Sequence, residues 1–460
     1  NWPRLEDVPD ILADLAAVQM HAIQTSGNCV RNTTTDQFAG VAADEIVDPR
    51  PYCELIRQWS TLHPEFAFLP RKFKIAVSGS VEDRAATHFH DVGIHLYLNA
   101  DGDLRVRFLA GGGLGRTPMV AAVIREDVEA AHLLTYLEAI LRVYNLHGRR
   151  DNKYKARIKI LVKAMGADAF AAAVDHEWNA LQGGENTLSD QALAEMAEHF
   201  GGPDYPPLDA QHEAAALGAA LEKEPLFARW VGTNGQLHQQ AGYRAVTITL
   251  KNTGLPPGDI SAAQLDALAD LADRFSFGEL RTTHEQNVVL ADVRESELFA
   301  LWKALQPLGL ATANAGQLTD IICCPGGDYC SLANAKSIPI AQALQERFEA
   351  MDYEHDLGPL ELNISGCMNA CGHHHVGNIG ILGVDKKGEE FYQVCIGGSQ
   401  AGNPQVAKIL GPSFGRDALP DVVEKLLQCF IGLREESESF LDVVERAGIE
   451  PFKKAVYEQA

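Results

Sequence analysis

The sequence predicts an α+β protein in which two pseudo-symmetric repeats each combine a strand-and-helix half-domain with a mixed α/β domain. Two observations predict this fold: a pattern of strand, Ser-Gly turn and β-hairpin occurs twice, and a strand–helix pattern precedes its second copy. The 460 residues give room for about three domains of ~150 residues. Apolar residues make up 46% and charged residues 22% of the chain, which is ordinary for a globular protein and excludes a disordered or fibrous one.

The clearer repeat relates residues 70–113 to residues 360–399. The first copy reads PRKFKIAVSGS at 70–80 and HDVGIHLYLNADGDLRVRFLAGGG at 90–113. The second copy reads LELNISG at 360–366 and HVGNIGILGVDKKGEEFYQVCIGGS at 375–399. Apolar and polar residues alternate along both arms of the first hairpin, and this period of two predicts a half-buried antiparallel pair.

A fainter repeat involves residues 245–306, which are expected to form a strand, a helix, a second strand over 280–290 and a second helix. Ser261 and Gln264 form a capping box at the start of the first helix. The segment LADV from Leu290 resembles LEDV at residues 5–8, each followed by a helical pattern. The sequence therefore predicts that the chain starts partway through its first unit, with an upstream strand and helix missing.

The segment between the copies is expected to be mostly helical. Leu134, Leu137, Leu141 and Tyr144 share one helix face, and Gly148 is a suitable stop. The basic run RRDNKYKARIK at 149–159 is consistent with a solvated helix face, with an anion or cofactor-carboxylate site, or with a docking patch for an electron carrier. GGPDYPPLD at 201–209 is expected to be a linker.

The net charge of −23 opposes general nucleic-acid binding, because a phosphate-binding surface is normally basic. An anionic substrate would need a local group of Lys and Arg. No stretch reaches the ~18 apolar residues of a membrane span, and no secretory signal opens the chain. A cytoplasmic protein without a membrane segment is expected.

Four of the nine cysteines form two closely spaced pairs, Cys324 with Cys330 and Cys367 with Cys371. Four thiolates suit an iron–sulfur cluster or a tetrahedral metal, although the five-residue gap in the first pair is wide for structural zinc. A disulfide framework is disfavoured without an export signal. Unrelated buried thiols are disfavoured by Gly366 and the glycines after Pro325, which let main-chain N–H groups approach sulfur closely. The remaining cysteines are expected to be packed thiols: Cys29, Cys53, Cys323, Cys395 and Cys429.

The spacing C-x5-C followed by C-x3-C, on the second of two repeats, resembles the signature of the siroheme-dependent sulfite and nitrite reductase family. The resemblance covers essentially the whole chain and implies siroheme and a 4Fe–4S cluster as cofactors. It implies that the four cysteines ligate the cluster and that Cys371 also bridges to the siroheme iron. Asn369 matches an asparagine that contacts the siroheme, whereas Met368 stands where a proline is common.

The same resemblance implies four segments. Residues 1–69 would be the remainder of the first ferredoxin-like half-domain, and 70–200 the first siroheme-clasping α/β domain without a cluster. Residues 201–312 would be the linker and the second ferredoxin-like half-domain. Residues 313–460 would be the second α/β domain, which carries the cluster and the axial ligand.

The substrate pocket is expected to contain Lys72, Lys74 and Arg31. By spacing alone, the two lysines would be a solvated strand end. The family resemblance implies that the PRKFK motif places both over the open face of the siroheme, where they bind the anion and donate protons. Arg31, in an RN segment, matches a pocket arginine. A further family arginine, in a TTRQN-like strand, would lie upstream of Asn1 and is not in this sequence.

Other residues are expected near the cofactor. Arg281, Gln286 and Asn287 belong to a segment that resembles the symmetry mate of the missing strand. Gly112 and Arg116 lie in AGGGLGRT (110–117), which is consistent with either a tight turn or a receptor for siroheme carboxylates. The consecutive residues His373, His374 and His375 point in different directions, so they are not expected to share a metal ion.

The resemblance implies an assimilatory sulfite reductase hemoprotein that reduces sulfite to sulfide. Lys74 favours sulfite, because nitrite reductases of the family commonly have Asn at this position. Nitrite reduction to ammonia is the alternative, and a non-catalytic iron–sulfur or zinc protein is the alternative from another class. No flavin or nicotinamide module is recognisable, so electrons are expected from a separate ferredoxin or flavoprotein subunit.

Overall fold

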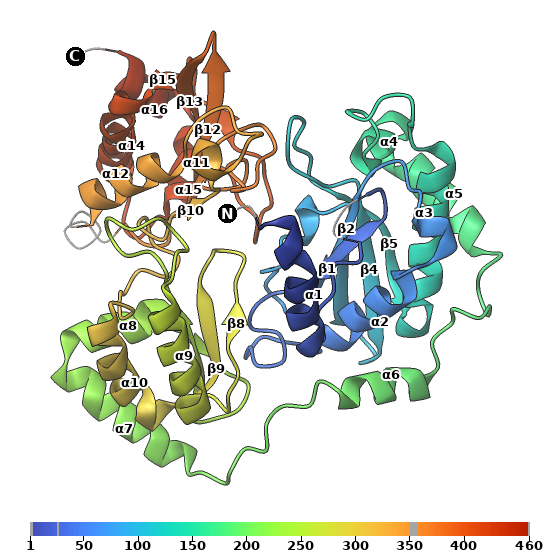
Figure 1. The fold of residues 1–460 in the computed structure, drawn as a ribbon, viewed down its shortest axis with the longest axis horizontal. Helices are drawn as coiled ribbons and strands as arrows, with labels where there is room; N and C mark the ends of the chain where they lie inside the picture. Colours follow the sequence, from blue (N-terminus) through green and yellow to red (C-terminus); the bar gives the residue numbers. More distant parts are fainter. Residues whose placement is uncertain (1–2, 25–26, 350–356, 459–460) are drawn as a thin grey trace.

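The computed structural model describes residues 3–24, 27–349 and 357–458, which form three sheets with helices packed around them (Figure 1). No helix in these ranges combines the length and apolar character that crossing a membrane requires. The order of the strands confirms the predicted α+β architecture with an internal duplication.

The first sheet has five strands in chain order. They are β1 (Val30–Thr34), β2 (Phe73–Ser78), β3 (Val92–Leu98), β4 (Leu104–Ala110) and β5 (Ala122–Glu129). The first three strands are parallel, and β3, β4 and β5 are antiparallel. The predicted hairpin is therefore formed by β3 and β4. Its turn uses Gly102 at φ +85°, a conformation that glycine adopts without strain.

The second sheet repeats this order of parallel and antiparallel strands. It contains β10 (Ile322–Cys323), β11 (Leu362–Ser365), β12 (Ile379–Lys386), β13 (Glu389–Ile396) and β14 (Lys408–Ile409), and β15 (Phe414–Gly415) also pairs with β13. Strands β10, β11 and β12 are parallel, and β12 and β13 form the second predicted hairpin. The two sheets thus share one topology.

The third sheet has the order β6 (Gly235–Leu237), β7 (Tyr243–Ile248), β9 (Val288–Arg294) and β8 (Arg281–Thr282). The single strand predicted over 280–290 is instead the hairpin of β8 and β9. The chain turns because the Thr283 hydroxyl accepts the N–H groups of Glu285 and Asn287, while Gln286 adopts φ +62°. Polar residues that bond to nearby main chain favour a turn over a continuous strand.

Helices pack around each of the three sheets (Figure 1). Those around the first sheet are α2 (Arg50–Ser60), α3 (Leu133–His147), α4 (Ile158–Met165) and α5 (Ala167–Trp178). Those around the third are α7 (Ala210–Lys223), α8 (Pro225–Asn234), α9 (Ala262–Phe275) and α10 (Leu298–Leu305). Those around the second are α12 (Ile338–Phe348), α14 (Leu419–Leu433), α15 (Phe440–Ala447) and α16 (Glu450–Tyr457). The predicted capping box of Ser261 and Gln264 opens α9.

The remaining elements are short or peripheral. They are the helices α1 (Val8–Ala17), α6 (Asp190–Glu198) and α11 (Gly326–Tyr329) and the 3-10 turns η1 (Leu5–Asp7), η2 (Pro64–Phe66), η3 (Thr87–Phe89), η4 (Ala130–His132), η5 (Glu295–Glu297), η6 (Gln306–Leu308) and η7 (Arg416–Ala418). Residues 199–209 connect α6 to α7 without regular structure, as predicted for 201–209. Tyr205 fixes this linker, because its hydroxyl donates to Asp292 at 2.5 Å.

Strand β1 lies within the segment 1–69 that was assigned to a ferredoxin-like half-domain. It pairs with β2 through Val30 opposite Phe73 and Asn32 opposite Lys74. By hydrogen bonding, β1 therefore belongs to the first α/β sheet, and a boundary at residue 70 would separate it from that sheet. The short pattern VRNTT carries too little periodicity to reveal its partner.

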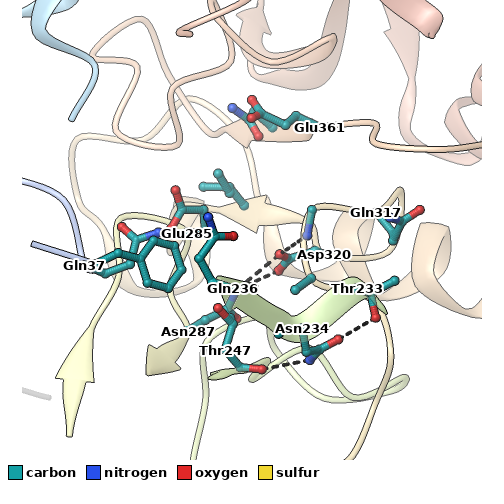
Figure 2. A pocket seen from close by; sticks show the side chains of 16 residues that line it. Gln37, Thr233, Asn234, Gln236, Thr247, Glu285, Asn287, Gln317, Asp320 and Glu361 are labelled. Carbon is teal, nitrogen blue, oxygen red and sulfur yellow. Dashed lines mark hydrogen bonds between the residues drawn. The ribbon is translucent and has the colours of Figure 1, made fainter. Parts of the chain in front are cut away.

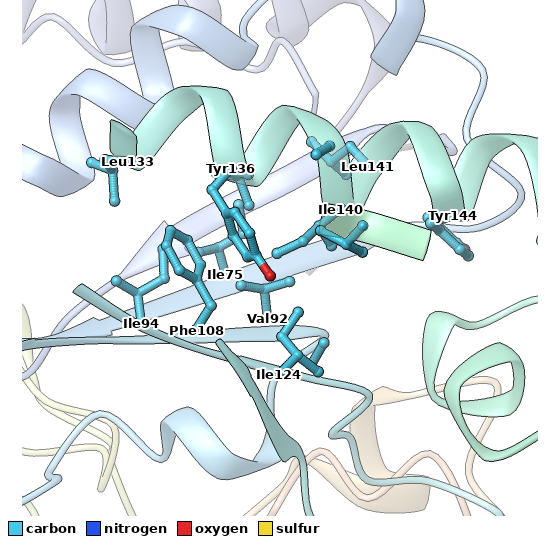
Figure 3. Close-up of a cluster of buried hydrophobic side chains, with 14 of the residues drawn as sticks. Ile75, Val92, Ile94, Phe108, Ile124, Leu133, Tyr136, Ile140, Leu141 and Tyr144 are labelled. Atoms are coloured by element: carbon cyan, nitrogen blue, oxygen red, sulfur yellow. The ribbon is translucent and has the colours of Figure 1, made fainter. Parts of the chain in front are cut away.

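The core of the first sheet lies between its strands and α3 (Figure 3). The predicted face of α3 is buried, and the helix ends at Gly148 as expected. The helix is buried on further faces as well, because α5 packs against it through Trp178, which contacts Tyr136. Phe108 from β4 completes the stack, with its ring centroid 4.7 Å from that of Tyr136.

Replacing Phe108 by Ala should lower the stability of the first α/β domain by about 3–5 kcal/mol, because it leaves a cavity in a fully buried cluster. Urea unfolding followed by circular dichroism would measure the loss. Val123→Ala, on the exposed side of β5, is the matched control and should change stability little. A Phe108→Ala variant that unfolds at the same urea concentration as Val123→Ala would contradict this description of the core.

Candidate active site

The two cysteine pairs lie at the ends of neighbouring parallel strands. Cys324 follows β10, and Cys330 ends the four-residue helix α11. Cys367 follows β11 after a single glycine, and Cys371 lies in the next turn. Strands β10 and β11 pair in parallel, so their carboxyl ends share one edge of the sheet. Pairs that are far apart in the sequence are therefore brought to one place.

Glycines hold these two loops closer together than other residues would allow. The N–H group of Gly366 donates to the Cys324 sulfur at 3.1 Å. A Cβ atom on Gly366 would lie 2.6 Å from the main-chain oxygen of Ala335 and 2.8 Å from the Cα atom of Gly326. A Cβ atom on Gly372 would lie 2.0 Å from the oxygen of Ile364. The predicted N–H contact to sulfur is present, and the cradle excludes side chains.

The charges of two other thiols and of two lysines affect the pKa of the Cys371 thiol. Burial raises the pKa of the Cys371 thiol, and the charges of Cys324 and Cys367 raise it further. The nearby ammonium groups of Lys72 and Lys74 act in the opposite direction. An electron-poor iron centre that accepted these sulfurs would relieve the repulsion among them, because ligation stabilises thiolates.

The spacing of the thiols does not suit a single zinc ion. Zinc–sulfur bonds of about 2.3 Å would place sulfur atoms about 3.8 Å apart. Within the described ranges, the one set of three potential ligand atoms lying within 4.8 Å of one another is Asp83, His88 and His95, none of them a cysteine. Four thiols at wider spacing fit a polynuclear cluster better than one ion.

Three cations lie together on the first sheet, and two of them, Lys72 and Lys74, interact with Cys371. Lys72 and Lys74 flank the start of β2, and Arg31 lies in an irregularity of β1 beside them. Burial lowers the pKa of both lysines, and the charges of Arg31 and Arg157 lower it further. None of the side chains of Arg31, Lys72 and Lys74 forms an ion pair or hydrogen bond with another described residue. In an acidic chain, a group of cations without ion-pair partners is electrostatically suited to an anion.

A buried ion pair of Asp91 and Arg157 lies against the main chain of Lys74. The Asp91 carboxylate is fully buried and accepts the main-chain N–H of Lys74 at 2.9 Å. It also accepts hydrogen bonds at 2.7–2.9 Å from Arg157, which lies in the basic run 149–159. The sequence pattern did not single out Asp91 as a partner of this run, because the two residues meet only in the folded chain.

The basic run divides into two parts. Arg157 and Lys159 turn inward, whereas residues 149–155 carry exposed cationic side chains. The buried Lys159 donates to the main-chain oxygens of Leu114 and Thr117 at 2.6 and 2.7 Å, so it fixes the glycine-rich loop 110–117. Burial lowers the pKa of Lys159 to about 8.

The glycine-rich loop of the first copy contacts the cysteine loop of the second. His375 Nε2 lies 2.9 Å from the main-chain oxygen of Gly115. Gly112 is buried at a position where a Cβ atom would lie 2.4 Å from the oxygen of His88. Arg116 lines a cavity of about 340 Å³ that also includes Met368, while Asn369 is exposed beside Cys371.

The predicted residues of the β8–β9 turn bind protein groups. Gln286 exchanges two hydrogen bonds of 2.9 Å with the main chain of Cys323, directly before the first cluster-motif cysteine. Asn287 donates to the carboxylate of Asp320. Arg281 donates to the main-chain oxygens of Gln37 and Ala39 at 3.1 and 2.7 Å. The structure thus gives these three side chains positioning contacts with the loops around the site.

Two histidines that the sequence analysis did not assign to the substrate pocket lie near Lys74. Burial lowers the pKa of His90 to about 4, with smaller contributions from Lys74 and His284. Burial likewise lowers the pKa of His373 to about 4, with contributions from His90 and Lys74. These imidazoles are neutral at pH 7, so Lys72 and Lys74 are the acidic N–H groups beside Cys371.

Comparison with known families decides the identity of this arrangement. The family model described as nitrite and sulphite reductase 4Fe-4S domain matches residues 26–181 and 315–460, more than half of the chain. The chain belongs to this family. A second model, the nitrite/sulfite reductase ferredoxin-like half domain, matches residues 236–308 and covers the third sheet.

Relatives within the family include reductases of both anions. The chain is 27% identical to a protein named sulfite reductase [ferredoxin] 1 from Mycolicibacterium paratuberculosis, covering 98% of this chain and 76% of that one. It is 28% identical to a chloroplastic ferredoxin–nitrite reductase from Zea mays, covering 95% and 73%. The solved structure of the Mycobacterium tuberculosis NirA protein superposes with a TM-score of 0.76 at 26% identity, covering 97% and 76%.

Family membership makes the chain a siroheme and iron–sulfur oxidoreductase, with siroheme and a 4Fe–4S cluster as cofactors. The donor chemistry fits the cluster, because the loops that carry the four cysteines meet at close-packed glycines and Cys371 interacts electrostatically with Cys324 and Cys367. The cationic group beside Cys371 fits an anionic substrate.

Replacing Gly366 by Ala should prevent assembly of the cluster, because its Cβ atom would separate the two cysteine loops. We expect iron and acid-labile sulfide per chain to fall at least several-fold in the purified protein. Gly415→Ala, where a Cβ atom meets nothing within 4 Å, is the matched control and should retain normal iron and sulfide. A fully loaded Gly366→Ala variant would show that the close approach is not required.

Proposed function

We propose that this chain is a ferredoxin-dependent sulfite reductase that reduces sulfite to sulfide with six electrons. Cys324, Cys330, Cys367 and Cys371 would hold the 4Fe–4S cluster, and Cys371 would also hold the siroheme iron. When bound, these cofactors supply the stored electrons and the iron at which the anion is reduced. The observation that carries the proposal is the group of unpaired cations beside Cys371.

The cations perform two tasks at this site. Arg31, Lys72 and Lys74 bind the anionic substrate, since none of them forms an ion pair with a described carboxylate. Lys72 and Lys74 also donate the protons that the departing oxygen atoms require. Their lowered pKa values make the ammonium groups better acids than a free lysine, whereas a guanidinium holds its protons too tightly.

The ion pair of Asp91 and Arg157 positions the proton donors. Asp91 fixes the main chain of Lys74, and Arg157 prevents the carboxylate from neutralising the Lys74 ammonium directly. Lys74 therefore remains free to face Cys371. The exposed cationic part of the basic run, residues 149–155, offers a docking area for an acidic ferredoxin on a chain that is otherwise negatively charged.

Sulfite is favoured over nitrite by Lys74, because a second lysine suits a dianion with three oxygens to remove. Turnover of each anion by the holoenzyme with a reduced viologen as donor tests this assignment. We expect a higher kcat/KM for sulfite, and a lower value for sulfite than for nitrite would reverse it. Competition between ferredoxin and a flavoprotein donor would test the partner.

Substituting Lys74 by Gln should lower kcat/KM for sulfite by about 10²-fold or more, since both a charge and a proton donor are lost. Lys74→Arg is the informative comparison, because it keeps the charge but not the acidity. We expect Lys74→Arg to recover KM and to leave kcat low. Equal recovery of both constants would show that Lys74 only binds the anion.

The rate should decline at alkaline pH. Lys72 and Lys74 act in their protonated forms, and their pKa values lie below the ~10.4 of a free lysine. Activity is therefore full below these lowered values and is lost as pH rises through them. A pH profile of kcat/KM would show this decline below pH ~10.4, and a flat profile up to that pH would contradict the assignment.

A further inference from the structure

The duplication assigns each position of the catalytic half a counterpart in the other half. The main-chain N–H of Lys74 donates to the Asp91 carboxylate at 2.9 Å, and that of Glu361 donates to the Asn378 side chain at 2.8 Å. Strands β2 and β11 hold the same place in their sheets. Glu361 is therefore the counterpart of Lys74, with the opposite charge.

The cysteine cradle also has a counterpart. The main-chain oxygens of Gly366 and Gly79 each accept hydrogen bonds from two successive N–H groups. Five residues after these glycines lie Cys371 and Arg84, respectively. Arg84 pairs with Asp44 at 2.8 Å and with Asp36 at 3.6 Å, so an ion-pair network occupies the place of the thiols.

A cavity of about 240 Å³ lies beside Glu361, at the counterpart of the anion pocket (Figure 2). Gln37 borders it from the first half, Glu285 and Asp320 from the segments before the second sheet, and Asn363 from β11. Its volume corresponds to several water molecules at ~30 Å³ each and is too small for a tetrapyrrole.

Three oxygen atoms of residues that line this cavity have no hydrogen-bond partner in the described part of the chain. They belong to the side chains of Gln37, Glu361 and Asn363. Asn363 is fully buried, and its Nδ2 donates to the main-chain oxygen of His373, so its oxygen is the free end. A buried acceptor without a hydrogen bond is destabilising, and a donor or cation in the cavity would satisfy it.

The ionisable residues that line the cavity are all acidic. Glu285, Asp320 and Glu361 are acidic, and the one buried ammonium beside them is Lys251. Lys251 is committed to the Asp320 carboxylate at 2.9 Å and to the main-chain oxygen of Glu285 at 2.5 Å. Burial raises the pKa of Glu361 to about 7, and the charges of Glu285 and Asp320 contribute. A bound cation would counter these effects.

We propose that this cavity is a binding site for a hard divalent cation, Mg²⁺ or Ca²⁺, held by Glu361 and the side-chain oxygen of Asn363, with Glu285 and Gln37 reaching the ion through water molecules. A lining of carboxylate and amide oxygens matches the ligands that both ions prefer. The cavity also has room for water molecules that stay on the ion, which is usual for Mg²⁺. This site does not depend on the proposed reductase activity.

The test is calorimetric titration of the holoenzyme with MgCl₂ and, separately, with CaCl₂ after removal of free metal by a mild chelator. We expect about one ion per chain, and we expect Glu361→Gln to weaken binding at least tenfold, since ligand charge sets the affinity of such sites. Gln37→Leu, which removes one unpaired oxygen without changing charge, should weaken binding by a smaller factor.

Glu445→Gln is the matched control, because this glutamate is exposed and does not line the cavity. It should bind the ion as the parent protein does. An unchanged visible spectrum and circular dichroism would show that each variant is folded and loaded. Absence of binding at millimolar Mg²⁺ and Ca²⁺, or equal affinity in Glu361→Gln and Glu445→Gln, would overturn the proposal.

Discussion

The close approach of two loops at Gly366 is the constraint on which the rest of the site depends. The parallel pairing of β10 and β11 brings the loops to one edge, and the missing side chain lets the N–H of Gly366 reach the Cys324 sulfur. Once the thiols are gathered there, Cys371 faces the cations of the first sheet. The proposed cofactor site and the proposed substrate site therefore both depend on the close packing at Gly366.

The two halves show how one scaffold can carry opposite electrostatics. Each half keeps the same order of strands. In each half a side chain, Asp91 or Asn378, accepts a main-chain N–H at the start of the second strand, and the oxygen of a glycine, Gly79 or Gly366, accepts two successive N–H groups. Lys74 in one half corresponds to Glu361 in the other, and Cys371 corresponds to Arg84. Main-chain hydrogen bonds preserve the fold, so the side chains at these positions were free to diverge.

Features with local signals could be predicted from the sequence. Alternation revealed the first hairpin, the repeat revealed the second, leucine spacing revealed α3, and the paired cysteines revealed the candidate site. The family follows from those cysteines and is confirmed by the matching models. The roles of Lys72, Lys74 and Arg31 remain proposals, although their proximity to Cys371 agrees with them.

Features set by tertiary contacts could not be predicted. The sequence aligned His375 with His90, but the main chain aligns it with His88, since the oxygens of His88 and His375 accept equivalent bonds from Ala121 and Ala407. The direction of Arg157 and Lys159 depends on Asp91 and the glycine-rich loop.

Arg281 joins two segments of the chain that are synthesised at different times. Its guanidinium holds the main chain of Gln37 and Ala39, more than two hundred residues upstream. Because residues 37–39 are synthesised before Arg281, these two hydrogen bonds can form only after the later segment has been made.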